Sequence, residues 1–304
     1  MKAFPLASRA LVLAAALLAC AAQAQTVDTL KNLKERGTVS IGVREASGAL
    51  SYAVGAGQYV GFHIDVCKQV VADLQRKLGL DRLEIRYTSV TNANRMPLMT
   101  NGTLDMECGS TTNTTARQRD VAFAPTLFVE TIRMLVRADS GITSIEQLGG
   151  KTVTSATGGT AVQHLRKHKR AANADFKEVF VKDNAEAFLM LENRRADAFV
   201  NDSQILATLI SSAKDPGAYR IVGESLSTEP IAIMLPKGDP AFKSAVEDSI
   251  KAMVASGQLA RIYDTWFMRP IPPRQVAVNL PASEATRAAW ADLNDRPMES
   301  YAAP

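Results

Sequence analysis

The chain has 304 residues, a formal net charge of +4 and 46% hydrophobic residues. So small a positive excess gives no electrostatic footprint for nucleic acid, and the basic run RKHKR at 166–170 fits a solvated helix face. A chain of this length can bury two cores, because single cores seldom grow beyond roughly 250–300 residues.

The first 24 residues have the three parts of a secretory signal peptide: basic Lys2 and Arg9, an apolar stretch over 10–19, and an Ala-Gln-Ala cleavage signal. The apolar stretch is too short to cross a bilayer, which takes about 20 residues. Cleavage after residue 24 removes two cations and no acid, so the net charge falls from +4 to +2. Cys20, which follows Leu-Leu-Ala, leaves open a lipid-anchored alternative. No other segment is apolar enough to span a membrane.

Short β-rich runs and helical runs then alternate in two rounds. The first round predicts strands at 38–44, 84–90 and 103–109, with helices at 61–80 and 93–100. The second predicts strands at 151–157, 176–183 and 196–202, with helices at 160–169 and 185–194. This βαβαβ order is typical of a mainly parallel sheet flanked by helices. We therefore expect an α/β protein with two similar units.

Two extended apolar runs, IRMLVRA at 132–138 and IAIMLPK at 231–237, belong to neither helix pattern. We interpret them as two strands that cross between lobes and form a hinge, with a cleft between the lobes. The helix expected over 240–256 would return to the first lobe. The expected domains are therefore lobe 1 at 25–131 plus 232–304, and lobe 2 at 132–231.

Two cysteines remain after cleavage, and both face core on the expected periodicity. Cys67 shares a helix stripe with Val71, Leu74 and Leu78, and Cys108 lies in the third strand. An exported protein can join two such residues in a disulfide. The sequence does not show whether their Cα atoms come within the required ~7 Å, so a bridge and two buried thiols both stay open.

Polar residues gather where the expected strands end, and in open α/β sheets ligands bind beyond the carboxyl ends of strands. Each one alone is typical of an ordinary loop, cap or turn. Together they match an α-amino acid, since an arginine fork and hydroxyl or N–H donors suit its carboxylate, and an aspartate suits its ammonium. The residues are Arg44, Ser110, Thr112, Arg117, Asp202 and, at the start of a helix where free N–H groups favour an anion, Thr160.

Arg95 lies inside the short apolar piece ANRMPLM, where an unpaired cation is costly unless an anion approaches. Arg44 likewise has no assigned partner. Surface ion pairing is the alternative for both residues.

The stretch ECGSTTNTTARQRDVAFAPTLFV, with TNANRMPLMTNGTLD before it and WFMRPIPP later, resembles the periplasmic glutamate/aspartate-binding proteins of bacterial ABC transporters. These belong to the polar-amino-acid solute-binding proteins, and the likeness covers about residues 29–273. It implies the two-lobed type II periplasmic binding protein fold, a location in the periplasm and a membrane permease as partner.

The resemblance also implies roles by position. Ser110, Thr112, Arg117 and Thr160 would hold the ligand's α-carboxylate. Asp202 and the region of Ser110 would hold its ammonium. Arg44 and Arg95 would hold the side-chain carboxylate.

Two positions depart from the pattern of that family. Asn92 stands where a serine is common, and Asn184 stands where a histidine often reaches the side-chain carboxylate. An amide can donate a hydrogen bond but adds no positive charge. We therefore expect an acidic or related amino acid as ligand, with altered preference among glutamate, aspartate and their amides.

A dehydratase-like enzyme of the same fold is the main alternative, but the three histidines, His63, His164 and His168, are not evidently placed beside a nucleophile. No metal cluster, P-loop or dinucleotide motif occurs, so we expect no cofactor and no metal. A sensory amino-acid-binding module is the second alternative, and the lack of an attached transmembrane or kinase region favours a free carrier. We expect a monomer with no nucleic acid partner.

Overall fold

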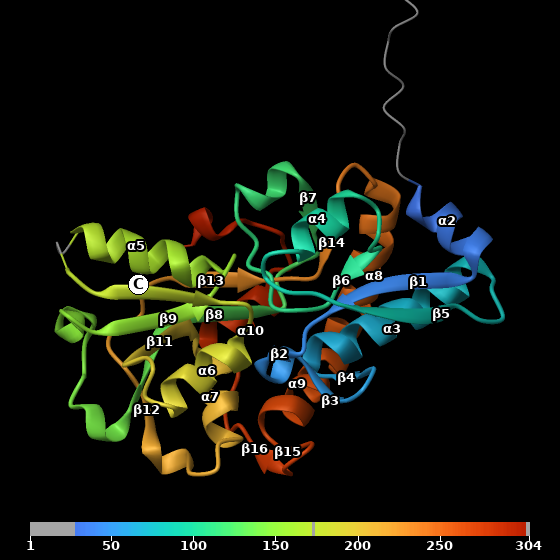
Figure 1. The fold of residues 1–304 in the computed structure, drawn as a ribbon. Helices are drawn as coiled ribbons and strands as arrows, with labels where there is room; N and C mark the ends of the chain where they lie inside the picture. Colours follow the sequence, from blue (N-terminus) through green and yellow to red (C-terminus); the bar gives the residue numbers. More distant parts are fainter. Residues whose placement is uncertain (1–27, 172–173, 302–304) are drawn as a thin grey trace, which may run out of the picture.

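The computed structural model describes residues 28–171 and 174–301. The predicted signal peptide at 1–24 and the alternative lipid anchor at Cys20 lie outside these residues. The described residues form two α/β units, which stand on the two sides of Figure 1.

The first unit is built on a five-stranded sheet with the order β5-β1-β6-β14-β7. β1 runs parallel to β5 and β6, whereas β14 is antiparallel to β6 and β7. The strands are β1 (Thr38–Val43), β5 (Glu84–Ser89), β6 (Met106–Glu107), β7 (Val121–Phe123) and β14 (Met234–Pro236). The helices are α2 (Thr29–Arg36), α3 (Phe62–Leu78), α4 (Arg95–Thr100), α8 (Pro240–Ala255) and α9 (Gln258–Phe267).

The second unit is built on a sheet with the order β10-β9-β11-β8-β12. β9, β10 and β11 are parallel, and β8 is antiparallel to β11 and β12. The strands are β8 (Phe128–Arg137), β9 (Thr152–Ala156), β10 (Lys177–Val181), β11 (Ala198–Asp202) and β12 (Tyr219–Val222). The helices are α5 (Thr160–Ala171), α6 (Asn184–Glu192) and α7 (Ser203–Ser211).

The remaining elements are small. A three-stranded sheet joins β2 (Ala46–Ser47), β3 (Ser51–Gly55) and β4 (Gln58–Val60), and a hairpin joins β15 (Pro270–Ile271) and β16 (Val276–Ala277). The helix α10 (Glu284–Ala291) packs against β8.

The two segments that cross between the units lie earlier in the sequence than we expected. β13 (Thr228–Ile231) pairs antiparallel with the first residues of β8, and the two lie side by side at the centre of Figure 1. The run IRMLVRA belongs to the second sheet from Ile132 to Arg137, because these residues pair with β11 and β12. In IAIMLPK, Ile231 ends β13 and Met234–Pro236 belong to the first sheet as β14. The expected boundaries at 131/132 and 231/232 therefore fall within β8 and at the end of β13.

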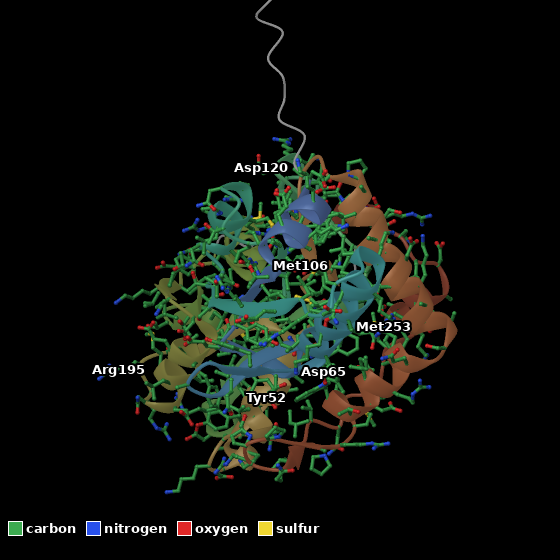
Figure 2. The ribbon with its side chains drawn as sticks, turned by 90° about the vertical axis from the view of Figure 1, so that its right-hand side faces the viewer. Tyr52, Asp65, Met106, Asp120, Arg195 and Met253 are labelled. Atoms are coloured by element: carbon green, nitrogen blue, oxygen red, sulfur yellow. A yellow bond between two sulfur atoms is a disulfide. The ribbon has the colours of Figure 1, made fainter. Side chains whose placement is uncertain are left out.

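Each unit has its own hydrophobic core, as the length of the chain led us to expect. The predicted stripe of α3 is buried at Val66, Val70 and Leu74 and packs with Phe242, Val246 and Ile250 of α8. Figure 2 looks onto this unit, with Met106 inside it and Asp120 and Arg195 at the outline. The final long helix thus returns to the first unit.

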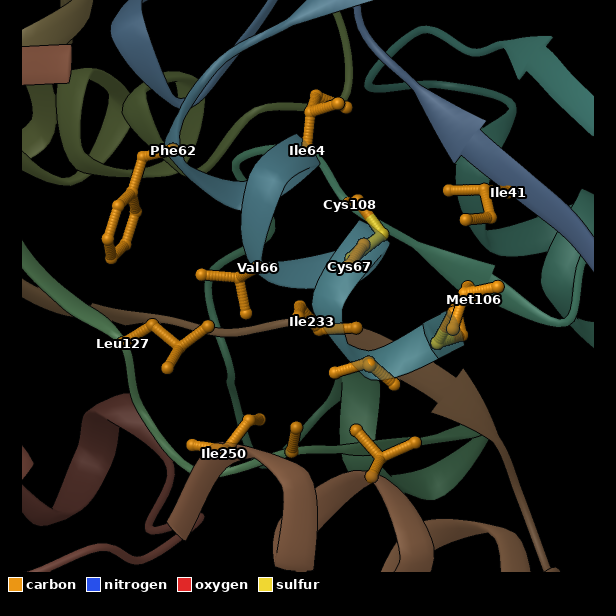
Figure 3. Close-up of a cluster of buried hydrophobic side chains, with 14 of the residues drawn as sticks. Ile41, Phe62, Ile64, Val66, Cys67, Met106, Cys108, Leu127, Ile233 and Ile250 are labelled. Carbon is orange, nitrogen blue, oxygen red and sulfur yellow. A yellow bond between two sulfur atoms is a disulfide. The ribbon is translucent and has the colours of Figure 1, made fainter. Parts of the chain in front are cut away.

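The open question of the cysteines is resolved in favour of a bridge. Cys67 of α3 and Cys108, which follows β6, form a disulfide with a Cα–Cα distance of 6.5 Å. It lies inside the core beside Met106 and Ile41 (Figure 3). The bond ties a covering helix to the strand that leads into the polar segment 109–119.

Replacing both Cys67 and Cys108 with serine is expected to lower the free energy of unfolding by about 2–4 kcal/mol, because the bridge closes a loop of 41 residues in the unfolded chain. Chemical denaturation of the variant and of the oxidised parent measures the difference. Unchanged stability would contradict a structural role for the bridge.

Candidate ligand-binding site

A small polar cavity with a volume of about 10 Å³ lies between the two units, at the carboxyl ends of their strands. Seven of the nine residues predicted from sequence line it. The lining residues are Asn92, Arg95, Ser110, Thr112, Gly159, Thr160, Asn184, Asn201, Asp202 and Ile205. The other two predicted residues, Arg44 and Arg117, lie outside this lining and contact residues that belong to it or adjoin it.

The polar segment after Cys108 is held as an extension of the strand pairs at the crossing. Thr112 forms an antiparallel bridge with Ile231, and the Asn113 side chain donates to the backbone oxygen of Asp295 at 2.8 Å. These contacts fix the backbone on both sides of Thr112. The strand ends here and is followed by hydroxyl and amide residues, because the chain leaves the sheet and forms the wall of the cavity.

Arg117 reaches from this segment across to the second unit. Its Nη1 donates to the Thr112 oxygen at 2.8 Å and its Nη2 to the Gly158 oxygen at 3.4 Å. Burial of the guanidinium and repulsion from Arg95 lower the pKa of Arg117 to about 9. The group is therefore still a cation at neutral pH.

Arg44 and Arg95 are buried, with 1% and 2% of their surface exposed, so the alternative of surface ion pairing is wrong. Arg44 Nη1 donates to Asn92 Oδ1 at 2.5 Å. Burial is the main cause that lowers the pKa of Arg44 to about 10, and repulsion from Arg95 contributes to the same shift. Arg95 Nη1 donates to the Ser110 oxygen at 3.3 Å, while its buried Nε has no hydrogen-bond partner. Burial also lowers the pKa of Arg95. Neither cation forms a salt bridge with another residue that the structure describes.

Asp202 ends β11 and stands at the N-cap position of α7, but its side chain does not cap the helix. Glu130 of β8 takes over that task, because its two oxygens accept from the Ser203 and Gln204 N–H groups at 3.1 and 3.2 Å. The Asp202 carboxyl is thereby left for the cavity. Burial raises the pKa of Asp202 well above its ordinary value, and the charges of Glu130 and Glu229 add to the shift.

The hydroxyls of Thr112 and Thr160 both donate to one oxygen, Glu229 Oε2, at 2.6 and 2.7 Å. The other oxygen of Glu229 accepts from Ser227 at 3.0 Å and contacts His164 Nε2 at 3.1 Å. Burial raises the pKa of Glu229, but these hydrogen bonds outweigh it and bring the pKa below its ordinary value. Among the residues that the structure describes, nothing accepts the backbone N–H of Thr112 or Thr160, so those N–H groups remain for a ligand.

Sequence reasoning missed Glu229, His164 and Glu130. A signal for His164 was present, since it lies four residues after Thr160 and one before Leu165, on the buried stripe of α5. Glu229 and Glu130 had no local signal. They face each other in the register of β8 and β13, which only the folded chain reveals.

Asn184 and Asn201 form a second polar link between the units. Asn184 is the first residue of α6, and its Nδ2 donates to the oxygen of Ala46, in the first unit, at 2.7 Å. Asn201 Nδ2 donates to Asn184 Oδ1 at 2.7 Å. Asn201 was also missed, because its position in a buried strand predicts packing rather than contact with a cavity.

No group of three or more potential metal ligands occurs within the described ranges 28–171 and 174–301. None of the helices in these ranges has the length and apolar character needed to span a membrane.

Two α/β units joined by crossing strands, with a polar cavity at the carboxyl ends of their strands, define a type II periplasmic binding protein fold. The chain belongs to the bacterial extracellular solute-binding proteins, family 3, which it matches over residues 39–269.

Two curated relatives match nearly the whole chain. The L-glutamate/L-aspartate-binding protein of Pseudomonas aeruginosa is 38% identical over 293 residues, which cover 95% of this chain and 96% of the relative. The glutamate/aspartate import solute-binding protein of Escherichia coli is 34% identical over 292 residues, which cover 94% of this chain and 97% of the relative. Among solved structures, a mutant of ArgBP from T. maritima has a TM-score of 0.69 at 26% identity, covering 79% of this chain and 99% of that one.

Membership of this family makes the protein an exported solute-binding component of transport and not an enzyme. The dehydratase-like alternative is therefore set aside.

Proposed function

We propose that the protein captures glutamate or aspartate between two closing lobes and delivers it to the permease of an ABC transporter. The observation that carries the choice of an acidic ligand is the burial of two arginines, Arg44 and Arg95, without a salt-bridge partner among the described residues. A buried cation is costly unless an anion pairs with it. The two curated relatives are named for binding glutamate and aspartate, which supports the same ligand class.

In the proposed complex, the α-carboxylate meets Arg117 and the backbone N–H groups of Thr112 and Thr160. The hydroxyls of these threonines stay on Glu229, which positions both residues. Asp202 and Ser110 receive the ammonium. The second carboxylate approaches Arg95, with Arg44 and Asn92 beside it.

Closure of lobe 1 (25–131 plus 232–304) on lobe 2 (132–231) would assemble this set, since each lobe carries only part of it. The contacts between the units support this mechanism. Asn184 reaches Ala46, and the Ala49 N–H donates to Thr208 Oγ1 at 3.2 Å. A ligand that touches both lobes binds the closed form better, and that difference in affinity shifts the population toward it.

The proposed setting is the periplasm, reached by cleavage of the signal peptide at 1–24, with the carrier acting as a monomer. Nucleic acid has no place in this function, and the mature charge of +2 after loss of Lys2 and Arg9 supports that view.

The proposal is tested by measuring the melting temperature of the purified exported protein with each amino acid and with common dicarboxylates. A ligand that binds only the folded form raises its stability. Glutamate or aspartate is expected to give the largest rise, followed up by calorimetry. A rise with arginine alone, or with no amino acid, would overturn the proposal.

The affinity for the amino acid is expected to fall on acidification. The raised pKa of Asp202 means that this carboxyl takes up a proton at a higher pH than an ordinary aspartate, and the stability that the proton adds at low pH is lost as the pH rises through the raised pKa. The ligand's ammonium needs the ionised carboxylate, so below the raised pKa binding must release that proton. The dissociation constant should rise by up to about tenfold per pH unit once the pH falls below the raised pKa, earlier than for an ordinary aspartate near 3.9.

Calorimetry between pH 8 and 5, in two buffers with different ionisation heats, measures both the affinity and the released proton. An affinity that does not vary over this range would remove Asp202 from the ammonium site.

A further inference from the structure

Two amide side chains in the cavity, Asn92 and Asn184, have a fixed orientation. Each contacts a group that can only donate or only accept a hydrogen bond. Arg44 can only donate hydrogen bonds, so the atom of Asn92 that it contacts at 2.5 Å is the oxygen. Asn92 Nδ2 therefore faces the second unit, where it lies 3.4 Å from the point that a Cβ on Gly159 would occupy. Only the donor end of Asn92 remains for a ligand.

Asn184 is fixed by the opposite argument. The backbone oxygen of Ala46 can only accept, so the atom of Asn184 that contacts it at 2.7 Å is Nδ2. Its Oδ1 then points to Asn201, whose Nδ2 donates to it at 2.7 Å. Asn201 thus occupies the acceptor end of Asn184, so this oxygen is not available to accept a hydrogen bond from a ligand.

The side-chain atoms that Asn92, Asn184 and Arg95 leave without a partner are consequently N–H donors. They are Asn92 Nδ2, the second hydrogen of Asn184 Nδ2 and the unpartnered Arg95 Nε. The acceptors left along the cavity, Asp202 and the oxygen of Asn201, follow each other at the end of β11 and suit the ammonium.

We infer that Asn201 is a specificity-determining positioning residue, which makes the site accept a side-chain carboxylate and reject a side-chain carboxamide. The inference rests on the proposed function. A carboxylate presents only acceptors to the donors, whereas the NH₂ of glutamine or asparagine would meet them without a partner. A buried donor left unpaired weakens binding substantially.

The test replaces Asn201 with leucine, which has a similar size and cannot donate, and compares the dissociation constants for glutamate and glutamine by calorimetry. The parent protein is expected to prefer glutamate at least tenfold. In Asn201→Leu, Asn184 Oδ1 loses its donor and becomes free to accept from the NH₂ of glutamine, so the preference should shrink by about tenfold. Thr154→Val is the control, because Thr154 is a buried hydroxyl of the same unit that contacts Met190 and not Asn184.

A double-mutant cycle that combines Asn201→Leu with Asn184→Ala separates an effect through Asn184 from a general loss of structure. If Asn201 acts through Asn184, Asn201→Leu will leave the glutamate-to-glutamine ratio unchanged when Asn184 is already alanine. A parent protein that binds no amino acid would defeat the proposed function itself. A parent that prefers glutamate, together with a folded Asn201→Leu that keeps the full preference, would overturn only the inference.

Should Asn201→Leu not fold, judged by its melting curve, Asn201→Ala provides the same comparison, because alanine cannot donate either. An unchanged ratio in that variant would equally contradict the role of Asn201.

Discussion

Arg117→Ala is expected to abolish measurable amino-acid binding. Truncation leaves the ligand's α-carboxylate without its main cation in a buried site, and the loss of one partner of a buried charge pair costs about 2–5 kcal/mol, or roughly 30- to 4,000-fold in affinity. The alanine also removes the contacts to Thr112 and Gly158, one of which spans the two units. Calorimetry with glutamate and aspartate measures the effect.

Arg119→Ala is the matched control. Arg119 ends the same short 3₁₀ turn, Arg117–Arg119, and its side chain is exposed. It should bind as the parent protein does. Unchanged affinity in Arg117→Ala, or equal losses in both variants, would remove Arg117 from the ligand site.

Gly158→Ala is expected to lower affinity by about tenfold or more by obstructing closure. Gly158 has a φ of +83°, and a Cβ there would lie 2.9 Å from the Asn92 oxygen and 3.1 Å from the Ala93 Cα. These are backbone atoms of the opposite unit, which cannot move aside as a side chain can. The closed form therefore loses stability relative to the open form.

Gly150→Ala controls for the strain that alanine adds to this backbone conformation. Gly150 belongs to the same unit, has a φ of +68° and would place its Cβ with nothing within 4 Å. Both variants should lose similar intrinsic stability, of about 1 kcal/mol. Only Gly158→Ala should lose affinity, and equal affinities in the two would exclude a steric role for Gly158 in closure.

Regular elements of this chain follow closely from local pattern. The apolar spacing of 61–80 and 240–256 predicted α3 and α8 to within two residues at each end. The strand at 103–109 was predicted too long, because only Met106–Glu107 pairs with its neighbours before the chain turns into the cavity wall. Most of the predicted residues at strand ends line the cavity because parallel strands deliver their carboxyl ends to one edge.

The parts of the site that the sequence did not reveal depend on long-range register. Glu130 and Glu229 are directly opposite each other only because β8 pairs with β13, across about a hundred residues of chain. Asn201 gains its partner only when α6 lies beside the end of β11. The disulfide stayed open for the same reason, since the 6.5 Å separation of its Cα atoms is set by packing of α3 on the sheet.

Glu229 holds Thr112 and Thr160 on a single oxygen, with one threonine in each unit. If those residues separate, that buried oxygen loses one of its two hydroxyl donors. Water must replace the lost hydroxyl, so escape of the cargo and hydration of this carboxylate become one event. Ligand release therefore requires water to enter the site. Osmolytes that lower the activity of water should slow the release of the ligand.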